Sequence, residues 1–462
     1  MIVMKFGGTS VEDARAIARC CAVVQARLDR QPVVVVSALA KVTDALLQAA
    51  SSAALGEDMA TTQVIDSLLQ RHQATARDLL HRPDDVLLSI NSLFAELRRL
   101  LSAICALREL TPRLSDRVVS FGELLSSAIF SEALREIGVA GSLVDARDCI
   151  ITDEHFGAAV PRIDESNDHL RAHLLPLLKE DKVPVLGGFV ASNGKGVTTT
   201  LGRGGSDFTA ALVGAALQAD RVEIWTDVDG IRTTDPRLYS KSRHVENLSF
   251  HEAAELAHFG AKVLHPATLL PAIDNNIPVH VLNSRNPEHP GTCVKADSSG
   301  PARVKAIAVK RGIILVEASA PRSLKRRGLA RELFSLLEQH GCTPDIASIS
   351  DTNVTVAIDK KDLVPLVCNG LGPRVTVHAE NSKALISLVA EGIRGIPNLP
   401  SQVFRALDGL DVRLISQGAS RWSFSVIVSE SDVSQAVQRL HQNLLENTLP
   451  AGCSEILEPA TA

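Results

Sequence analysis

Short apolar segments alternate with helical periods along the first two thirds of the chain. The segment Pro32–Val36 contains four consecutive valines and no polar residue, which predicts a strand buried on both faces. Similar segments predict strands at 2–5, 183–186, 222–225 and 278–282. Between the first two strands, apolar residues recur at helical spacing at Val11, Ala14, Ile17, Ala18, Cys21 and Val24. Strands that alternate with helices indicate an α/β fold built on a largely parallel sheet.

Two later stretches depart from this alternation. The stretch 42–110 is rich in alanine and leucine and lacks strand signals, so we expect it to be helical. Linker residues follow at Asp297–Pro301, where we place a domain boundary. Beyond this boundary we expect strands at 313–316, 344–350 and 353–358 and a helix at 328–339.

The last part of the chain repeats this βαββ pattern. Strands are expected again at 385–389, 412–416 and 422–428, with a helix at 401–407. Leu333-Phe334 has a counterpart in Val403-Phe404, and the segment 353–356 has one in 423–426. Two copies predict a paired small-ligand module, with a duplicated domain that only dimerises as the alternative.

Charge and composition exclude several classes of partner. The net charge is −5 and only 3% of the residues are aromatic, so we expect no nucleic-acid partner. No apolar run approaches membrane-spanning length, so we expect no membrane contact. The chain starts directly with a predicted strand, which favours a cytoplasmic protein. The eight cysteines include no Cys-x-x-Cys pair, so we interpret them as free thiols.

The first candidate chemistry follows the first predicted strand, in the sequence Lys5-Phe6-Gly7-Gly8-Thr9-Ser10. Two glycines between a strand and a helix allow backbone N–H groups to approach an anion. Lys5 adds an ammonium group in a strand that is otherwise apolar. The sequence lacks a P-loop and a Gly-x-Gly-x-x-Gly motif after a strand, so neither of these nucleotide-binding arrangements is predicted.

A second glycine-rich cluster, Gly202-Arg203-Gly204-Gly205-Ser206-Asp207, precedes a predicted helix. Arg203 has the geometry to hold a carboxylate or a phosphate in a bidentate manner. Asp207 would either cap the helix or orient a catalytic lysine. Further downstream, Thr226 and Asp227 follow a predicted strand, at the edge where open α/β sheets bind ligands.

Six motifs occur in the order found in aspartate kinases, and the chain resembles that family over essentially its whole length. They are KFGGTSV, Ser37 with Thr43 downstream, SFGE at 120–123, GRGGSD, WTDVDGI with TTDPR, and FGAKVLHP. The resemblance implies an αβα sandwich of the amino-acid kinase type with a mainly parallel sheet, at 1–297. It also implies two ferredoxin-like βαββαβ ACT domains within 302–449. The first of these (313–380) would be inserted into the second (302–312 plus 381–449).

The same resemblance implies a reaction and a set of site residues. The enzyme would transfer a phosphoryl group from ATP to the β-carboxylate of L-aspartate, the first step of lysine, threonine and methionine biosynthesis. Lys5 and Asp207 would be catalytic, and aspartate would be bound by Ser37, Thr43, Glu123 and Arg203. ATP would be held by Gly7, Gly8, Thr226, Asp227, Arg232, Arg237 and Lys262. Mg²⁺ would arrive on the phosphate oxygens of ATP, so no protein ligand for a metal is expected.

Regulation by an end-product amino acid is also expected from the resemblance. Asp345, Ser348 and Asp351 fall where lysine-sensitive aspartate kinases carry residues near the effector, and a carboxylate pair favours an ε-ammonium. Threonine is the alternative effector, supported by the segment 416–420. The ACT domains would assemble a homodimer or a homotetramer. Another amino-acid kinase and a non-catalytic amino-acid sensor remain as alternative functions, although the presence of Lys5, Glu123, Arg203 and Asp207 argues against the sensor.

Overall fold

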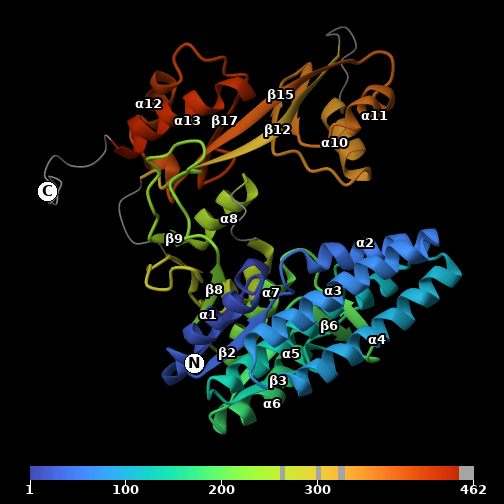
Figure 1. Ribbon diagram of the computed structural model, residues 1–462. Helices are drawn as coiled ribbons and strands as arrows, with labels where there is room; N and C mark the ends of the chain where they lie inside the picture. Colours follow the sequence, from blue (N-terminus) through green and yellow to red (C-terminus); the bar gives the residue numbers. More distant parts are fainter. Residues whose placement is uncertain (261–265, 298–302, 321–327, 447–462) are drawn as a thin grey trace, which may run out of the picture. The chain divides into compact units, whose positions relative to one another are not determined.

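The computed structural model describes residues 1–260, 266–297, 303–320 and 328–446, which form two compact units (Figure 1). The first unit contains residues 1–231, 244–253 and 266–297. The second contains residues 232–243, 254–260 and the described residues from 303 onward. Two segments that precede the expected linker thus pack with the second unit. The domain ranges expected from the resemblance stay predictions.

The first unit is built on an eight-stranded sheet with the order β3-β5-β2-β1-β8-β10-β11-β9 among the described residues. The first six strands are parallel neighbours, β11 runs antiparallel to β10, and β9 is parallel to β11. The prediction of a mainly parallel sheet is therefore confirmed. In sheet order the strands are Gly141–Val144, Val183–Gly187, Pro32–Val36, Ile2–Phe6, Arg221–Thr226, Val279–Asn283, Thr292–Lys295 and Asn247–Ser249.

A second, smaller sheet contains the strand that leads into the second glycine-rich cluster. Its strands are β4 (Ile151–Thr152), β6 (Val190–Asn193) and β7 (Thr198–Thr200). β6 and β7 pair in an antiparallel manner, as expected for two strands joined by the tight turn at Gly194.

Helices cover both faces of the main sheet, because the side chains of β1 alternate between two cores. Ile2, Met4 and Phe6 belong to a buried cluster with α1 (Ala14–Gln25) and α5 (Pro112–Glu136). Val3 points the other way, toward Gly214 of α7. The predicted αβα sandwich is confirmed. The remaining helices of this unit are α2 (Val42–Leu55), α3 (Asp58–Leu79), α4 (Asp84–Leu107), α6 (Ile163–Lys179), α7 (Gly205–Leu217) and α9 (Leu270–Asp274), and α8 (Phe250–His258) begins in it.

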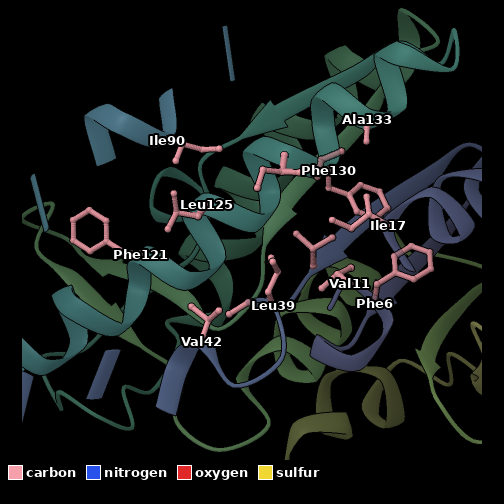
Figure 2. Close-up of a cluster of buried hydrophobic side chains, with 14 of the residues drawn as sticks. Phe6, Val11, Ile17, Leu39, Val42, Ile90, Phe121, Leu125, Phe130 and Ala133 are labelled. Atoms are coloured by element: carbon pink, nitrogen blue, oxygen red, sulfur yellow. The ribbon is translucent and has the colours of Figure 1, made fainter. Parts of the chain in front are cut away.

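The core between β1, α1 and α5 fixes the positions of the strand and the helix that carry site residues. Phe6 stacks on Phe130 of α5 with ring centroids 5.5 Å apart, in the cluster shown in Figure 2. α5 starts where Thr111 caps it, accepting a hydrogen bond from the Leu114 N–H, with Pro112 in its first turn. Truncating a fully buried phenylalanine such as Phe6 or Phe130 to alanine costs about 3–5 kcal/mol.

The described residues of the second unit form a six-stranded antiparallel sheet with the order β13-β14-β12-β15-β17-β16. In chain order each half contributes strand, helix, strand, strand and helix, so the predicted repeat is confirmed. The first half is β12 (Ala306–Ser319), α10 (Leu329–Gln339), β13 (Ile346–Ile349), β14 (Asn353–Ile358) and α11 (Leu363–Gly370). The second half is β15 (Thr376–Val389), α12 (Leu399–Ala406), β16 (Leu414–Gln417), β17 (Ser423–Ser429) and α13 (Val433–His441).

Two local features differ from or add to the expectations. The first helix starts at Ala14 rather than near Val11, because the Asp13 side chain caps it by accepting the Ala16 N–H. A short 3₁₀ turn, Gly8–Ser10, lies between β1 and this helix and contains the second glycine, so Gly7 and Gly8 lie several residues before the N-terminus of the helix. None of the described helices has the length and apolar character needed to cross a bilayer.

Candidate active site

One cavity of about 740 Å³ in the first unit brings together all of the predicted catalytic and aspartate-binding residues. It opens at the carboxyl ends of β1 and β2, where open α/β sheets bind ligands. Residues from six segments of the chain form its wall. Those predicted from the sequence are Lys5, Gly8, Ser37, Thr43, Glu123, Arg203 and Asp207.

Lys5 and Asp207 form an ion pair in this cavity, with Nζ 2.7 Å from Oδ1. Lys5 lies on the same face of β1 as Val3, which is the face that packs against α7. Asp207 lies in the first turn of α7 but does not cap it, since the N-cap position belongs to Gly204. The two side chains are only 11% and 14% exposed, so the ion pair is largely shielded from solvent.

Glu123 is a buried carboxylate with one oxygen unused. The Ala38 N–H donates to its Oε1 at 3.1 Å, whereas its Oε2 has no hydrogen-bond partner among the described residues. Burial raises the pKa of Glu123 from 4.5 to about 8, against the opposing influence of the Ala38 N–H and of Lys5. A buried acceptor without a partner is costly, so this oxygen is suited to a cationic ligand group.

The segment after β2 is held close to the glycine turn after β1. The Ser37 N–H donates to the Phe6 carbonyl at 3.0 Å, and the Ala40 N–H donates to the Gly8 carbonyl at 3.1 Å. A Cβ atom at Gly8 would lie 3.0 Å from the Ala38 carbonyl oxygen, so glycine permits this close approach. The backbone contacts thereby place Ser37 and Thr43 on the cavity wall beside Lys5.

Arg203 is exposed on the loop between β7 and α7, and it makes no hydrogen bond or ion pair with the described residues. Its guanidinium group is therefore available to a ligand. Gly204 and Gly205 lie at the N-terminus of the thirteen-residue α7, as the sequence predicted for this cluster. The first N–H groups of a helix and its dipole favour negative charge there.

Gly7, Thr226 and Asp227 lie together but do not line the cavity. The Gly7 N–H donates to the Trp225 carbonyl at 3.0 Å, which joins the glycine turn to the end of β8. Ser10 and Ser284 reinforce this connection, since their hydroxyl oxygens are 2.8 Å apart and donate to the carbonyls of Trp225 and Thr226. Thr226 and Asp227 extend from the same strand end.

Two other predicted nucleotide residues, Arg232 and Arg237, belong to the second unit. Arg232 donates through Nε to Ser242 Oγ at 2.9 Å, and Arg237 pairs with Asp235 at 2.7 Å. Both guanidinium groups are thus engaged within their own loop, and their contacts with a nucleotide stay predictions. Lys262 lies outside the described residues.

The three predicted effector residues differ in their surroundings. The Asp345 side chain is only 4% exposed, and the Lys310 ammonium lies 2.8 Å from its Oδ1 and 3.0 Å from Asp359. Ser348 and Asp351 are exposed at the outer strand of the sheet and at the turn that follows it. Their roles toward an effector stay predictions.

The cavity wall also contains residues that no motif indicated. Lys41 and Phe189 both line it with positive φ angles of 67° and 65°, a conformation that side chains other than glycine rarely adopt and that clusters at functional sites. Asp116 lines it as a buried acid on α5, two helical turns before Glu123. Burial raises the pKa of Asp116, while hydrogen bonds from Thr200 and Gly157 act in the opposite direction.

Comparison with known proteins gives one consistent answer. Residues 1–283 match the Amino acid kinase family, and residues 386–444 match an ACT domain. The chain is 37% identical over 459 residues to the lysine-sensitive aspartokinase 3 of Escherichia coli, with 96% of this chain and 99% of that protein covered. It is 34% identical over 469 residues to the chloroplastic aspartokinase 1 of Arabidopsis thaliana, covering 96% and 80%.

The chain belongs to the aspartokinase family. Two solved structures of E. coli aspartokinase III superpose on it, each covering 96% of this chain and 99% of the other. The complex with aspartate and ADP (R-state) has a TM-score of 0.82 at 36% identity. The complex with lysine and aspartate (T-state) has a TM-score of 0.83 at 37% identity. The resemblance read from the six motifs is confirmed, and this aspartokinase carries both a kinase unit and an ACT region.

Proposed function

We propose that this aspartokinase transfers the γ-phosphoryl group of ATP to the β-carboxylate of L-aspartate within the 740 Å³ cavity. One observation carries the assignment of the site: the dry Lys5–Asp207 ion pair shares this cavity with the unpartnered oxygen of Glu123. The pair suits phosphoryl transfer, because an ammonium group held in place stabilises charge on the transferring group without reorganisation.

Recognition of aspartate follows from two opposite charges on the cavity wall. Glu123 Oε2 would accept a hydrogen bond from the substrate ammonium, and the free guanidinium of Arg203 would hold its α-carboxylate. Ser37 and Thr43 would complete the pocket. The β-carboxylate is then left toward Lys5. It needs no general base, because a carboxylate is already ionised at neutral pH.

Nucleotide binding is assigned to the ends of β1 and β8, where Gly7, Gly8, Thr226 and Asp227 meet, with Arg232, Arg237 and Lys262 as further predicted contacts. The E. coli structure in complex with aspartate and ADP supports a nucleotide beside the aspartate pocket. Mg²⁺ would be held by phosphate oxygens. The described residues offer no group of three or more His, Cys, Asp or Glu side chains arranged around one metal position, and the Asp207 carboxylate already faces Lys5.

L-Lysine is the inhibitor that we propose, acting through Asp345, Ser348 and Asp351. The similarity to the lysine-sensitive aspartokinase 3 of E. coli and to the lysine-bound T-state structure supports this effector. In the unliganded chain Lys310 already neutralises Asp345, so an effector ammonium would have to displace the Lys310 ammonium to reach that carboxylate.

The ACT region would also assemble the oligomer, as a homodimer or a homotetramer. β13 and β16 are the outer strands of the described sheet, and Ile349 on β13 is 59% exposed. An open strand edge with exposed apolar residues is a site for pairing with a second copy. Sedimentation velocity across a concentration series distinguishes a monomer from these two assemblies.

One assay tests the catalytic proposal. Purified enzyme is incubated with ATP, Mg²⁺ and L-aspartate, and the acyl phosphate is trapped with hydroxylamine as the hydroxamate. Hydroxamate must appear with aspartate and must be absent with glutamate or without ATP. Parallel series with millimolar lysine and threonine identify the effector: inhibition by threonine without inhibition by lysine contradicts the lysine assignment.

A further inference from the structure

Asp116 connects three parts of the chain at the cavity wall. It lies near the start of α5, and its buried carboxylate accepts three hydrogen bonds. Oδ2 accepts the N–H groups of Gly157 and Thr200, each at 3.0 Å, and Oδ1 accepts the Thr200 hydroxyl at 2.7 Å. Thr200 is the last residue of β7, three positions before Arg203.

The two segments that Asp116 holds also contact each other. The Ala159 N–H donates to the Thr200 carbonyl at 2.9 Å. Gly202 has a φ of +71°, and a Cβ atom there would lie 3.2 Å from the Gly157 carbonyl oxygen. Asp153 closes the neighbouring loop by accepting the N–H groups of His155 and Val160. Arg203 therefore projects from a short loop whose base is anchored on one side by Asp116.

From these contacts we propose that Asp116 is a positioning residue that holds the Arg203 loop in place to receive the α-carboxylate of aspartate. The inference rests on the proposed role of Arg203. Arg203 itself has no partner among the described residues, so its loop must be ordered through the backbone at its base. The two N–H groups and the hydroxyl on Asp116 supply that order, because three donors converge on one buried acceptor.

The first test compares two substitutions of Asp116. Asp116→Ala removes the acceptor of all three hydrogen bonds, and we expect the KM for aspartate to rise roughly tenfold or more, with the KM for ATP changed less than about twofold. In Asp116→Asn the amide oxygen can accept both N–H groups while the amide nitrogen donates to the Thr200 hydroxyl. The asparagine variant should therefore retain a KM for aspartate within about threefold of the parent. Equal losses in both variants would mean that the charge acts directly, and would overturn the proposal.

A double-mutant cycle with Arg203→Ala separates positioning from direct contact. If Asp116 acts through Arg203, Asp116→Ala adds little to the KM for aspartate once Arg203 is absent. An undiminished effect in the Arg203→Ala background refutes the proposal. Asp145→Ala is the matched control: Asp145 also accepts a backbone N–H, from Arg147, but it lies away from the cavity wall. It should leave both KM values unchanged.

Thr200→Val keeps the test decisive if Asp116→Ala does not fold. It removes one donor to Asp116 and keeps the backbone N–H, so a folded Thr200→Val enzyme should show a smaller rise in the KM for aspartate alone. A parental KM in that variant overturns the inference. Thermal unfolding is recorded for every variant. Failure of the parent enzyme to form aspartyl hydroxamate would reject the proposed function instead, which keeps the two failures distinct.

Discussion

The pH dependence of aspartate binding is the sharpest consequence of the buried Glu123 carboxylate. With a pKa of about 8 in the unliganded enzyme, roughly 1% of Glu123 is ionised at pH 6 and about half at pH 8. The substrate ammonium should bind the ionised form. We therefore expect kcat/KM for aspartate to rise close to tenfold per pH unit above pH 6 and to level off above about pH 8.

Glu123→Gln tests this assignment because it removes the titrating group and keeps the shape. The variant should have a low, flat kcat/KM for aspartate, nearly equal to that of the parent at pH 6 and about a hundredfold lower at pH 9. Glu180→Gln, at an exposed glutamate, is the matched control and should retain the parental profile. A parental profile that stays flat from pH 6 to 9, or a Glu123→Gln profile that still rises, refutes the reasoning.

The stability of the unliganded enzyme should change with pH in the opposite direction to kcat/KM. Because the folded-state pKa of Glu123 is raised, the folded chain binds more protons than the unfolded chain between pH 4.5 and about pH 8. Stability should therefore fall as pH rises through this window. Across this pH window the free energy of unfolding should fall by on the order of 5 kcal/mol. Glu123→Gln should remove this loss, so thermal unfolding followed by circular dichroism should show the variant as the more stable protein at pH 9.

Three further predictions follow from other contacts. Lys5→Ala should lower turnover by a factor on the order of 10²–10⁴ in a folded protein, measured as hydroxamate formation at saturating substrates, and near-normal turnover would rule out its role. Arg203→Lys should raise the KM for aspartate more than the KM for ATP, and a loss that falls on ATP would reassign the loop. Asp345→Ala should relieve inhibition by lysine with activity preserved, whereas Lys310→Met should lower the half-inhibitory lysine concentration; unchanged inhibition curves in both would remove Asp345 from the effector site.

Much of the first unit could be predicted because its signals are local. The valine run at Pro32–Val36 coincides with β2. At the start of α8, Ser249 and Glu252 have the spacing of a capping box, and their side chains accept each other's backbone N–H groups. Lys5 and Ser37 could be assigned to one site from the family resemblance, and the structure brings them together because parallel neighbouring strands end at the same edge of the sheet. Asp116 and Phe189 could not, since one helical acid and one phenylalanine carry no local pattern and their significance depends on distant partners.

The long strands of the second unit show a different limit. The sequence predicted strands at 313–316 and 385–389, but β12 and β15 each extend over fourteen residues. Charged and polar residues interrupt the apolar pattern midway, at Lys310 to Gly312 and at Glu380 to Lys383, and the register shifts there. The two strands pair on both sides of the interruption. This pairing joins residues far apart in the sequence, so the local alternation of apolar and polar residues does not predict it.

The choice of a carboxylate as acceptor explains the balance of charge in the cavity. An ionised nucleophile needs cations and oriented N–H groups rather than a base, and among the described residues that line the cavity there is no histidine or cysteine. Among its buried or half-buried acids besides Glu123, Asp207 faces Lys5 and Asp116 holds the Thr200 backbone, while Asp44 lies exposed on the wall. Glu123, with a pKa of about 8, has the basicity of a general base, but binding the substrate ammonium would occupy its free oxygen. A hydroxyl acceptor would thus find no buried carboxylate free to take its proton, so the same contacts that bind aspartate favour an acceptor that has already lost one.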